Sequence, residues 1–233
     1  MLLINAIELN EVLTWLDDKD DVCLRDSPPE LIAHRARCLK LSAESMLDPL
    51  TRLLSRRRLD QSLCRATADA TLELPISLLL GDLDHFKSVN DRFGHRAGDE
   101  LLFLIATALK QNCDHSASVG RIKGETFAIV CQCDAAAALT LADELRQIAK
   151  SCETKVGASA TLSFGVATTN RSMDGHQLMQ RADQALYAAK ASGRDNCVSY
   201  ADLQAECRNA GYEVDVVGLE NHARVLADRL AGL

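Results

Sequence analysis

The alternation of apolar and polar positions changes its period several times between Glu73 and Tyr200. Short runs that are apolar almost throughout predict buried strands, and longer stretches with an apolar residue every three or four positions predict helices. The predicted elements, in chain order, are a strand at 76–84, a helix at 97–111, a hairpin at 118–132, a helix at 135–150, a strand at 160–169 and a helix at 174–193. This order predicts an α/β domain whose helices cover a sheet, and the hairpin makes that sheet mixed.

The flanking segments have patterns of their own. Residues 1–28 read as strand, helix and strand, and the pattern DDVCLRDSPPELIAHR resembles the last third of a receiver domain, although no room precedes it for a phosphate-accepting half. Residues 29–47 predict a helical linker, which either pairs as a short coiled coil or packs alone on its own domain. Its apolar seam is Ile32, Ala36, Leu39, Ala43 and Met46. Residues 201–233 predict a C-terminal appendage of a helix, a strand-like YEVDVV and an amphipathic helix.

Composition and charge narrow the possible partners. A formal net charge of -7 with 47% hydrophobic residues fits a folded chain without the clustered positive surface that nucleic acid or an anionic membrane requires. No apolar run reaches the ~20 residues of a membrane span. The start MLLINAIELNEV carries acids where a signal peptide carries bases. We therefore expect a cytoplasmic protein that binds neither nucleic acid nor membrane.

The nine cysteines are scattered, odd in number and free of any CxxC pair, which predicts reduced thiols. Cys131 and Cys133 lie two apart in a predicted strand, so their side chains share one face. Because so short a motif is poor evidence for a metal site, packing is the favoured interpretation of this pair.

The segment LLLGDLDHFKSVNDRFGHRAGDE is the first candidate for chemistry. In it an apolar strand runs into Asp82 and Asp84, and such a strand end presents side chains to a cleft at the edge of the sheet. Two neighbouring acids favour a divalent cation such as Mg²⁺, which takes carboxylate oxygens together with substrate phosphates. Turns and helix caps also favour Asp, so the pair alone does not establish a metal site.

Four motifs occur together along the chain: DPLTRLLSRRRLD, GDLDHFKSVNDRFGHRAGDE, GRIKGETFAIV and ADQALYAAKASGRDN. In this order and spacing they resemble the GGDEF domain of diguanylate cyclases, over residues 48–200. The resemblance implies a mixed sheet flanked by helices, like the palm of polymerases and adenylate cyclases. It also implies GTP as ligand and Mg²⁺ or Mn²⁺ as cofactor, with two GTP-loaded halves meeting in a two-fold dimer.

Matched position by position, the resemblance gives each site residue a role. Asp82 and Glu125 match metal ligands, and Glu125 lies in the catalytic signature. Lys190 and Arg194, four apart on the last predicted helix, would share one face and bind phosphate. The substrate-binding positions as a whole are His85, Phe86 and Lys87 in a loop around the phosphates, Asn90 and Asp99 at the guanine, Arg121, Gly124, Lys190 and Arg194.

The signature itself departs from the family. The family's Gly-Gly-Asp/Glu-Glu-Phe reads Lys123-Gly124-Glu125-Thr126-Phe127 in this chain. Thr126 replaces the Glu that the family requires for catalysis, and a hydroxyl is neither an anionic ligand nor a proton acceptor near neutral pH. A primed two-residue turn would also require a positive φ at Lys123, which strains a residue with a Cβ by roughly 1 kcal/mol.

A second departure lies upstream of the signature. Active family members often carry an RxxD product-inhibition motif there, and the equivalent positions are Asp114, His115, Ser116 and Ala117. A carboxylate in place of the guanidinium would repel the phosphodiester of cyclic di-GMP, so we expect no feedback binding at this loop.

Two functions stay open. The first is a degenerate GGDEF domain in cyclic di-GMP signalling that binds GTP and Mg²⁺, has impaired or absent catalysis and regulates a protein partner. The second is an active diguanylate cyclase that condenses two GTP to cyclic di-GMP and pyrophosphate. Thr126 and Lys123 favour the first, and the retained ligand positions favour the second. Either is expected to form a homodimer through the GGDEF face or the helical linker.

Overall fold

The computed structural model describes residues 46–209, and the predictions for residues 1–45 and 210–233 lie outside this range. The helices are α3 (Arg56–Ala68), α4 (Phe86–Phe93), α5 (His95–Gln111), α6 (Ala135–Lys150), α7 (Gly175–Ala191) and α8 (Tyr200–Asn209). The strands are β1 (Leu54–Ser55), β2 (Ile76–Leu83), β3 (Ser118–Lys123), β4 (Thr126–Cys131), β5 (Leu162–Thr169) and β6 (Cys197–Ser199). Every element predicted between residues 73 and 200 is present, and the predicted mixed α/β fold is confirmed.

The strands form one mixed sheet in the order β1-β3-β4-β2-β5-β6. The long strand β2 lies inside the sheet and is antiparallel to both β4 and β5, whereas the short strands β1 and β6 add in parallel to β3 and β5. In this register Asp82, near the end of β2, lies opposite Thr126 on one side and Ser163 on the other. The sheet therefore brings the second predicted motif and the signature hairpin together.

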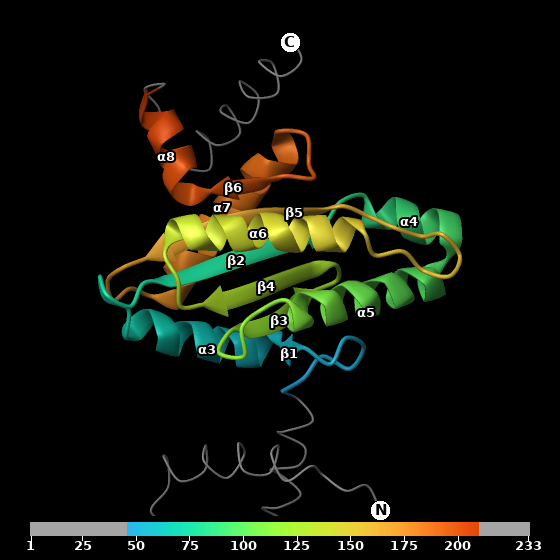
Figure 1. Ribbon diagram of the computed structural model, residues 1–233, viewed down its shortest axis with the longest axis horizontal. Coiled ribbons are helices and arrows are strands. Elements are labelled where there is room, and N and C mark those ends of the chain that lie inside the picture. Colours follow the sequence, from blue (N-terminus) through green and yellow to red (C-terminus); the bar gives the residue numbers. More distant parts are fainter. Residues whose placement is uncertain (1–45, 210–233) are drawn as a thin grey trace, which may run out of the picture. The chain divides into compact units, whose positions relative to one another are not determined.

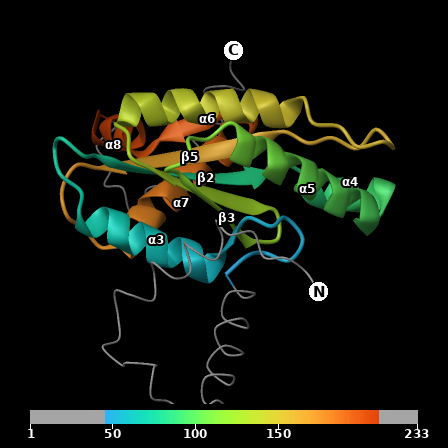
Figure 2. The same ribbon diagram turned by 60° about the horizontal axis from the view of Figure 1, so that its bottom comes forward.

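Helices cover both faces of the sheet, with α5 and α6 on one face and α3 and α7 on the other (Figures 1 and 2). Leu79 and Leu83 of β2 belong to the core beneath α5 and α6, while Leu78 and Leu80 belong to the core beneath α3 and α7. Since successive side chains of a strand point to opposite faces, a strand buried on both faces must be apolar almost throughout. This explains the uninterrupted apolar run that predicted β2.

Four elements were not predicted: β1, α3, α4 and β6. The helix expected just after residue 200 is present as α8, which packs Leu203 and Cys207 against Ala188 of α7. None of the helices between residues 46 and 209 is both long enough and apolar enough to cross a bilayer.

The contact between β5 and α7 is unusually close because Gly165 has no side chain. A Cβ at this position would overlap the backbone of α7 at Ala182 and Leu186. Strand and helix therefore approach each other through Gly165, and this approach sets how near the C-terminal end of α7 comes to the end of β2.

We expect Gly165→Ala to destabilise the domain by about 1–3 kcal/mol, since the overlap is with backbone that no rotamer change can relieve. Gly175→Ala is the matched control, because its Cβ would meet Cys64 at 3.2 Å or more, a tight but tolerable contact. The free energy of unfolding in urea measures both changes. Equal losses at the two positions would show that close packing at Gly165 is not what matters.

Candidate nucleotide and metal site

The Asp82 carboxylate is the meeting point of three elements. From β4, the Thr126 hydroxyl donates a hydrogen bond of 2.7 Å to Asp82 Oδ2. From α7, the Lys190 ammonium forms an ion pair with Asp82 Oδ1. Thr126 is buried, whereas the Lys190 side chain keeps 32% of its surface exposed. Both carboxylate oxygens thus have a proton donor, one neutral and fixed, the other charged and partly in solvent.

Asp84, the other acid of the motif, has a different role. It is 3% exposed and accepts hydrogen bonds from the hydroxyls of Thr161 and Ser163 and from the backbone N–H of Asp195. A buried carboxylate with this many donors needs no cation. The idea that the two acids together favour a cation is therefore wrong for Asp84, which ties the end of β2 to the start of β5 and to the loop after α7.

The signature turn is not built as expected. Lys123 pairs with Thr126, so the two central residues of the turn are Gly124 and Glu125, and the positive φ of 48° falls on Gly124. Lys123 does not have a positive φ. An irregularity in β3 between Arg121 and Lys123 shifts the register by one residue. The expected strain at Lys123 is absent, and that argument against activity is removed.

Glu125 lies half-buried in this turn. Its carbonyl accepts a hydrogen bond of 3.3 Å from the N–H of Leu83, which holds the turn beside the end of β2. Within residues 46–209 its carboxylate makes no hydrogen bond or ion pair. The predicted metal ligand is thus close in the fold to Asp82 and has its carboxylate available.

Arg121 connects the Gly124–Glu125 turn to Asp48. Its Nε donates to the Gly124 carbonyl at 2.7 Å, and its Nη1 lies 3.1 Å from Asp48 Oδ1. The same carboxylate accepts from the Thr51 N–H and hydroxyl. Burial acts to raise the pKa of Asp48, but the hydrogen bonds from Thr51 and Arg121 outweigh it and lower the pKa. Arg121, predicted to contact substrate, is committed in this structure to joining the DPLT segment to the signature.

The predicted phosphate loop is largely a helix start. His85 adopts the left-handed conformation, with φ 55°, and Phe86 and Lys87 form the first turn of α4. Phe86 is buried, so at this position only the backbone could contact a phosphate. The first N–H groups of a helix have no partner within it and point along the axis, which suits an anion. Lys87 is exposed beside them.

Asn90 and Asp99 lie on the consecutive helices α4 and α5. The Asn90 amide packs against Gly98, and any Cβ there would overlap its Oδ1. Gly98 therefore makes room for the amide one residue before Asp99, which is exposed. Among the described residues neither side chain forms a hydrogen bond or ion pair, so the predicted guanine-binding pair is free to meet a base.

Lys190 and Arg194 do not share a helical face, and this prediction is wrong. Helix α7 ends at Ala191, and Gly193 and Arg194 follow with φ of 113° and 65°. Arg194 is exposed in the loop beyond the helix, with no side-chain partner among residues 46–209. The Gly two residues past the helix end was a visible stop signal.

The loop that carries Arg194 is fixed through its neighbour Asp195. The Asp195 carboxylate accepts from Arg146 at 2.5 Å and from Lys150 at 2.6 Å, both on α6. Burial acts to raise the pKa of Asp195, but the hydrogen bonds from Lys150 and Arg146 outweigh it and lower the pKa. With Asp84 holding its N–H, Asp195 is anchored on two sides. Sequence patterns did not reveal this anchor.

The described residues contain no group of three or more His, Cys, Asp or Glu side chains that could hold a metal ion. Asp82 and Glu125 together supply two carboxylates. Mg²⁺ in nucleotide sites is usually held by one or two carboxylates plus the substrate phosphates. The donor set therefore fits Mg²⁺ or Mn²⁺ brought in with a triphosphate.

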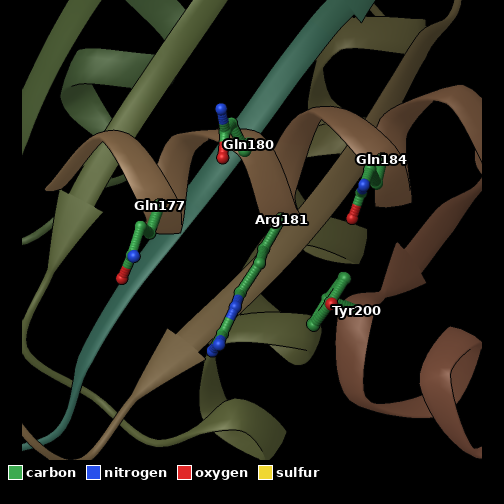
Figure 3. A pocket seen from close by; sticks show the side chains of 5 residues that line it. All are labelled: Gln177, Gln180, Arg181, Gln184 and Tyr200. Carbon is green, nitrogen blue, oxygen red and sulfur yellow. The ribbon is translucent and has the colours of Figure 1, made fainter. Parts of the chain in front are cut away.

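A polar hollow of about 260 Å³ lies elsewhere on α7. Figure 3 shows its lining side chains, with Arg181 extended beside Tyr200, whose ring centre is 5.4 Å from the guanidinium carbon. The lining residues are Gln177, Gln180, Arg181, Gln184 and Tyr200, and none is a predicted site residue. It offers no carboxylate to a metal, so the candidate metal site is the one at the end of β2.

This fold and site define a nucleotidyl-cyclase-like domain. The family model for the diguanylate cyclase GGDEF domain matches residues 45–196, and the chain belongs to this family. It is 31% identical over 198 residues to diguanylate cyclase DgcS of Shewanella oneidensis, covering 83% of this chain and 67% of the relative. The chain spans only 23% and 49% of the length of two other curated diguanylate cyclases that it matches.

Solved structures agree with this assignment. The GGDEF domain of DgcB from Caulobacter crescentus in complex with c-di-GMP matches with a TM-score of 0.63 and 32% identity, covering 67% of this chain and 96% of that one. Diguanylate cyclase SiaD in complex with its activator SiaC, from Pseudomonas aeruginosa, matches with a TM-score of 0.63 and 30% identity over 83% of this chain and 72% of that one. The chain is thus a GGDEF protein of the diguanylate cyclase family in c-di-GMP signalling.

The two acids of the motif should respond differently to alanine. Asp84→Ala leaves buried donors without an acceptor, so we expect a loss of about 3 kcal/mol in the free energy of unfolding. Asp82→Ala should cost less stability, about 1 kcal/mol, because Lys190 can turn to solvent. It should instead abolish binding of a non-hydrolysable GTP analogue with Mg²⁺. Urea denaturation and calorimetry separate the two effects, and undiminished nucleotide binding by Asp82→Ala would remove Asp82 from the site.

Proposed function

We propose that this GGDEF domain binds GTP with Mg²⁺ or Mn²⁺ in the cytoplasm, has impaired or absent catalysis, and acts as a regulatory module in cyclic di-GMP signalling. The observation that carries the proposal is the hydrogen bond from the Thr126 hydroxyl to Asp82. Where active members place a second acid, this chain places a neutral donor that already occupies one oxygen of the metal-ligand carboxylate.

Nucleotide binding is supported by the groups left available around Asp82. The N–H groups at the start of α4 and the exposed Lys87 and Arg194 suit phosphates. Asn90 and Asp99 offer an amide and a carboxylate, which match the donor and acceptor edges of guanine. Asp82 and Glu125 would hold the metal, which when bound supplies Lewis-acid stabilisation to a phosphoryl oxygen. Lys190, partly exposed, can serve Asp82 or a phosphate.

Impaired catalysis is supported by what Thr126 cannot do. A hydroxyl does not ionise near neutral pH, so it adds no charge to hold a second metal and takes no proton from an attacking hydroxyl. The hydroxyl instead donates its own proton to Asp82, with 2.7 Å between Thr126 Oγ1 and Asp82 Oδ2. Removal of one acid from a two-metal site commonly lowers the rate by orders of magnitude.

An active diguanylate cyclase, producing cyclic di-GMP and pyrophosphate from two GTP, is the second candidate. The unstrained hairpin favours it, since Lys123 keeps an ordinary backbone conformation and Glu125 keeps its place beside the end of β2. In either case we propose a homodimer that meets through the GGDEF face or the helical linker at 29–47.

A protein partner is a further part of the proposal. The relative SiaD is described in complex with its activator SiaC. By analogy, we propose that a protein partner regulates this chain, whose proposed GGDEF-like domain at 48–200 is flanked by segments at 1–28 and 201–233.

Metal binding should depend on nucleotide. With only two carboxylates at the site, we expect Mg²⁺ alone to give no saturable heat in calorimetry at millimolar concentration. A non-hydrolysable GTP analogue should bind at least about tenfold more tightly with Mg²⁺ than without it, a gain of about 1.4 kcal/mol. The ATP analogue with Mg²⁺ is the control for the base contacts. Saturable Mg²⁺ binding without nucleotide, or no GTP binding at all, would contradict the proposal.

Restoring the acid should restore catalysis. We expect Thr126→Glu to raise cyclic di-GMP formation at least tenfold, which requires only about 1.4 kcal/mol of transition-state stabilisation. Lys123→Gly should add little, because Lys123 is not strained. Thr126→Val is the matched control, since it removes the hydroxyl from Asp82 without adding charge and should leave the rate low. Product is quantified by chromatography after incubation with GTP and Mg²⁺ or Mn²⁺.

Two outcomes would defeat this account of Thr126. The unchanged chain could match Thr126→Glu in rate, in which case Glu125 alone suffices. Alternatively, Thr126→Glu could remain inactive while it binds GTP and dimerises. In that case the defect lies in how the two GGDEF domains of the dimer contact each other.

A further inference from the structure

Two thiols lie in contact at the end of β4, away from the nucleotide site. The sulfurs of Cys131 and Cys133 are 3.3 Å apart, with one thiol hydrogen-bonded to the other. Cys131 pairs with Ser77 across the sheet, whereas Thr126, at the other end of the same strand, pairs with Asp82. Both cysteines are half-buried, so each residue keeps part of its surface exposed to solvent.

The local backbone explains why these sulfurs meet. In a regular strand, residues two apart share a face at a Cα separation of about 6.6 Å, near the upper limit for a disulfide. Here β4 ends at Cys131 and the chain bends at Gln132, so Cys133 lies outside the regular strand. The bend allows the second side chain to turn toward the first, and the two sulfurs already lie 3.3 Å apart.

The contact also shifts the pKa values of the two thiols in opposite directions, so that one is the better nucleophile. The hydrogen bond with Cys131 lowers the pKa of Cys133, against the opposing effect of burial. The same bond, with burial, raises the pKa of Cys131. Elsewhere in residues 46–209, burial raises the pKa of Cys113 to about 11 and of Cys197 to about 12. A thiolate is the reactive form of cysteine, so the lowered pKa makes Cys133 the attacking thiol of this pair.

We propose that Cys131 and Cys133 form an oxidant-sensitive dithiol that closes to an intrachain disulfide when a peroxide or a low-molecular-weight disulfide supplies the oxidising equivalents. With hydrogen peroxide, the Cys133 thiolate attacks one oxygen, the O–O bond breaks, and the departing hydroxide takes a proton to become water. The Cys131 sulfur then attacks the Cys133 sulfenic acid, the S–OH bond breaks, and hydroxide leaves with the Cys131 proton as a second water. Two thiols lose two electrons and one peroxide gains them.

Proteolytic cleavage after Lys and Arg places these cysteines in a fragment whose mass reports the modification. Cleavage after Lys123 and Arg146 releases residues 124–146, which contain Cys131 and Cys133 and no other cysteine. Cleavage after Arg58 and Arg65 releases residues 59–65, in which the exposed Cys64 is alone. The second fragment is an internal control for general oxidation.

The test treats the reduced full chain with hydrogen peroxide or oxidised glutathione, alkylates the remaining free thiols, and maps the unreduced fragments by mass spectrometry. We expect fragment 124–146 to lose two hydrogens and escape alkylation, while Cys64 stays mostly alkylated, and a dithiol reductant to reverse the loss. In the untreated chain, alkylation at neutral pH should be at least about tenfold faster at Cys133 than at Cys131.

Single substitutions identify the attacking sulfur. Cys131→Ser should trap Cys133 as a sulfenic acid or as a mixed disulfide with glutathione, whereas Cys133→Ser should leave Cys131 unoxidised. The proposal is overturned if fragment 124–146 keeps two free thiols under conditions that oxidise Cys64. It is also overturned if wild-type Cys133 accumulates as a glutathione adduct without closing on Cys131.

Discussion

The candidate site of this domain depends on how the Asp82 carboxylate is satisfied at the end of β2. A strand buried on both faces delivers this acid to the edge of the core, where an unpaired carboxylate would be unfavourable. The Thr126 hydroxyl supplies a fixed donor and the Lys190 ammonium a mobile charge. Both depend on the fold around them, because the β2–β4 register places Thr126 and the close approach at Gly165 places α7.

The same interaction sets the charge of the candidate site. A Glu at position 126 would add a third acid beside Asp82 and Glu125, and mutual repulsion among them would favour binding of further cations. Thr126 instead satisfies Asp82 without adding charge, so a single cation and Lys190 suffice. The groups around the site are otherwise kept in place: Asp84 and Asp195 hold the loop before β6, and Arg121 braces the turn. Within the candidate metal site, the departure from the family is thus local to the Thr126 side chain.

Local sequence patterns predicted most of this fold and the place of the candidate site. They failed where the structure depends on contacts between residues far apart in the sequence. The apolar run of β2 and the helical periods of α5, α6 and α7 are properties of single elements. The donors to Asp84, by contrast, come from residues 77 to 111 positions away in the chain. The irregularity in β3 shifts the turn, so that Gly124 and not Lys123 has the positive φ. The order of residue types in the sequence does not reveal such a shift. For Arg194 the signal existed, since Gly193 marks the end of α7.

The central claim is that Thr126 leaves the site able to hold one metal with GTP rather than the two that catalysis requires. Electron paramagnetic resonance of Mn²⁺ bound to the full chain with a saturating non-hydrolysable GTP analogue counts these ions directly. We expect one tightly bound Mn²⁺ per nucleotide in the unchanged chain, with Thr126→Glu recovering a second. Two tightly bound ions per nucleotide in the unchanged chain would contradict it.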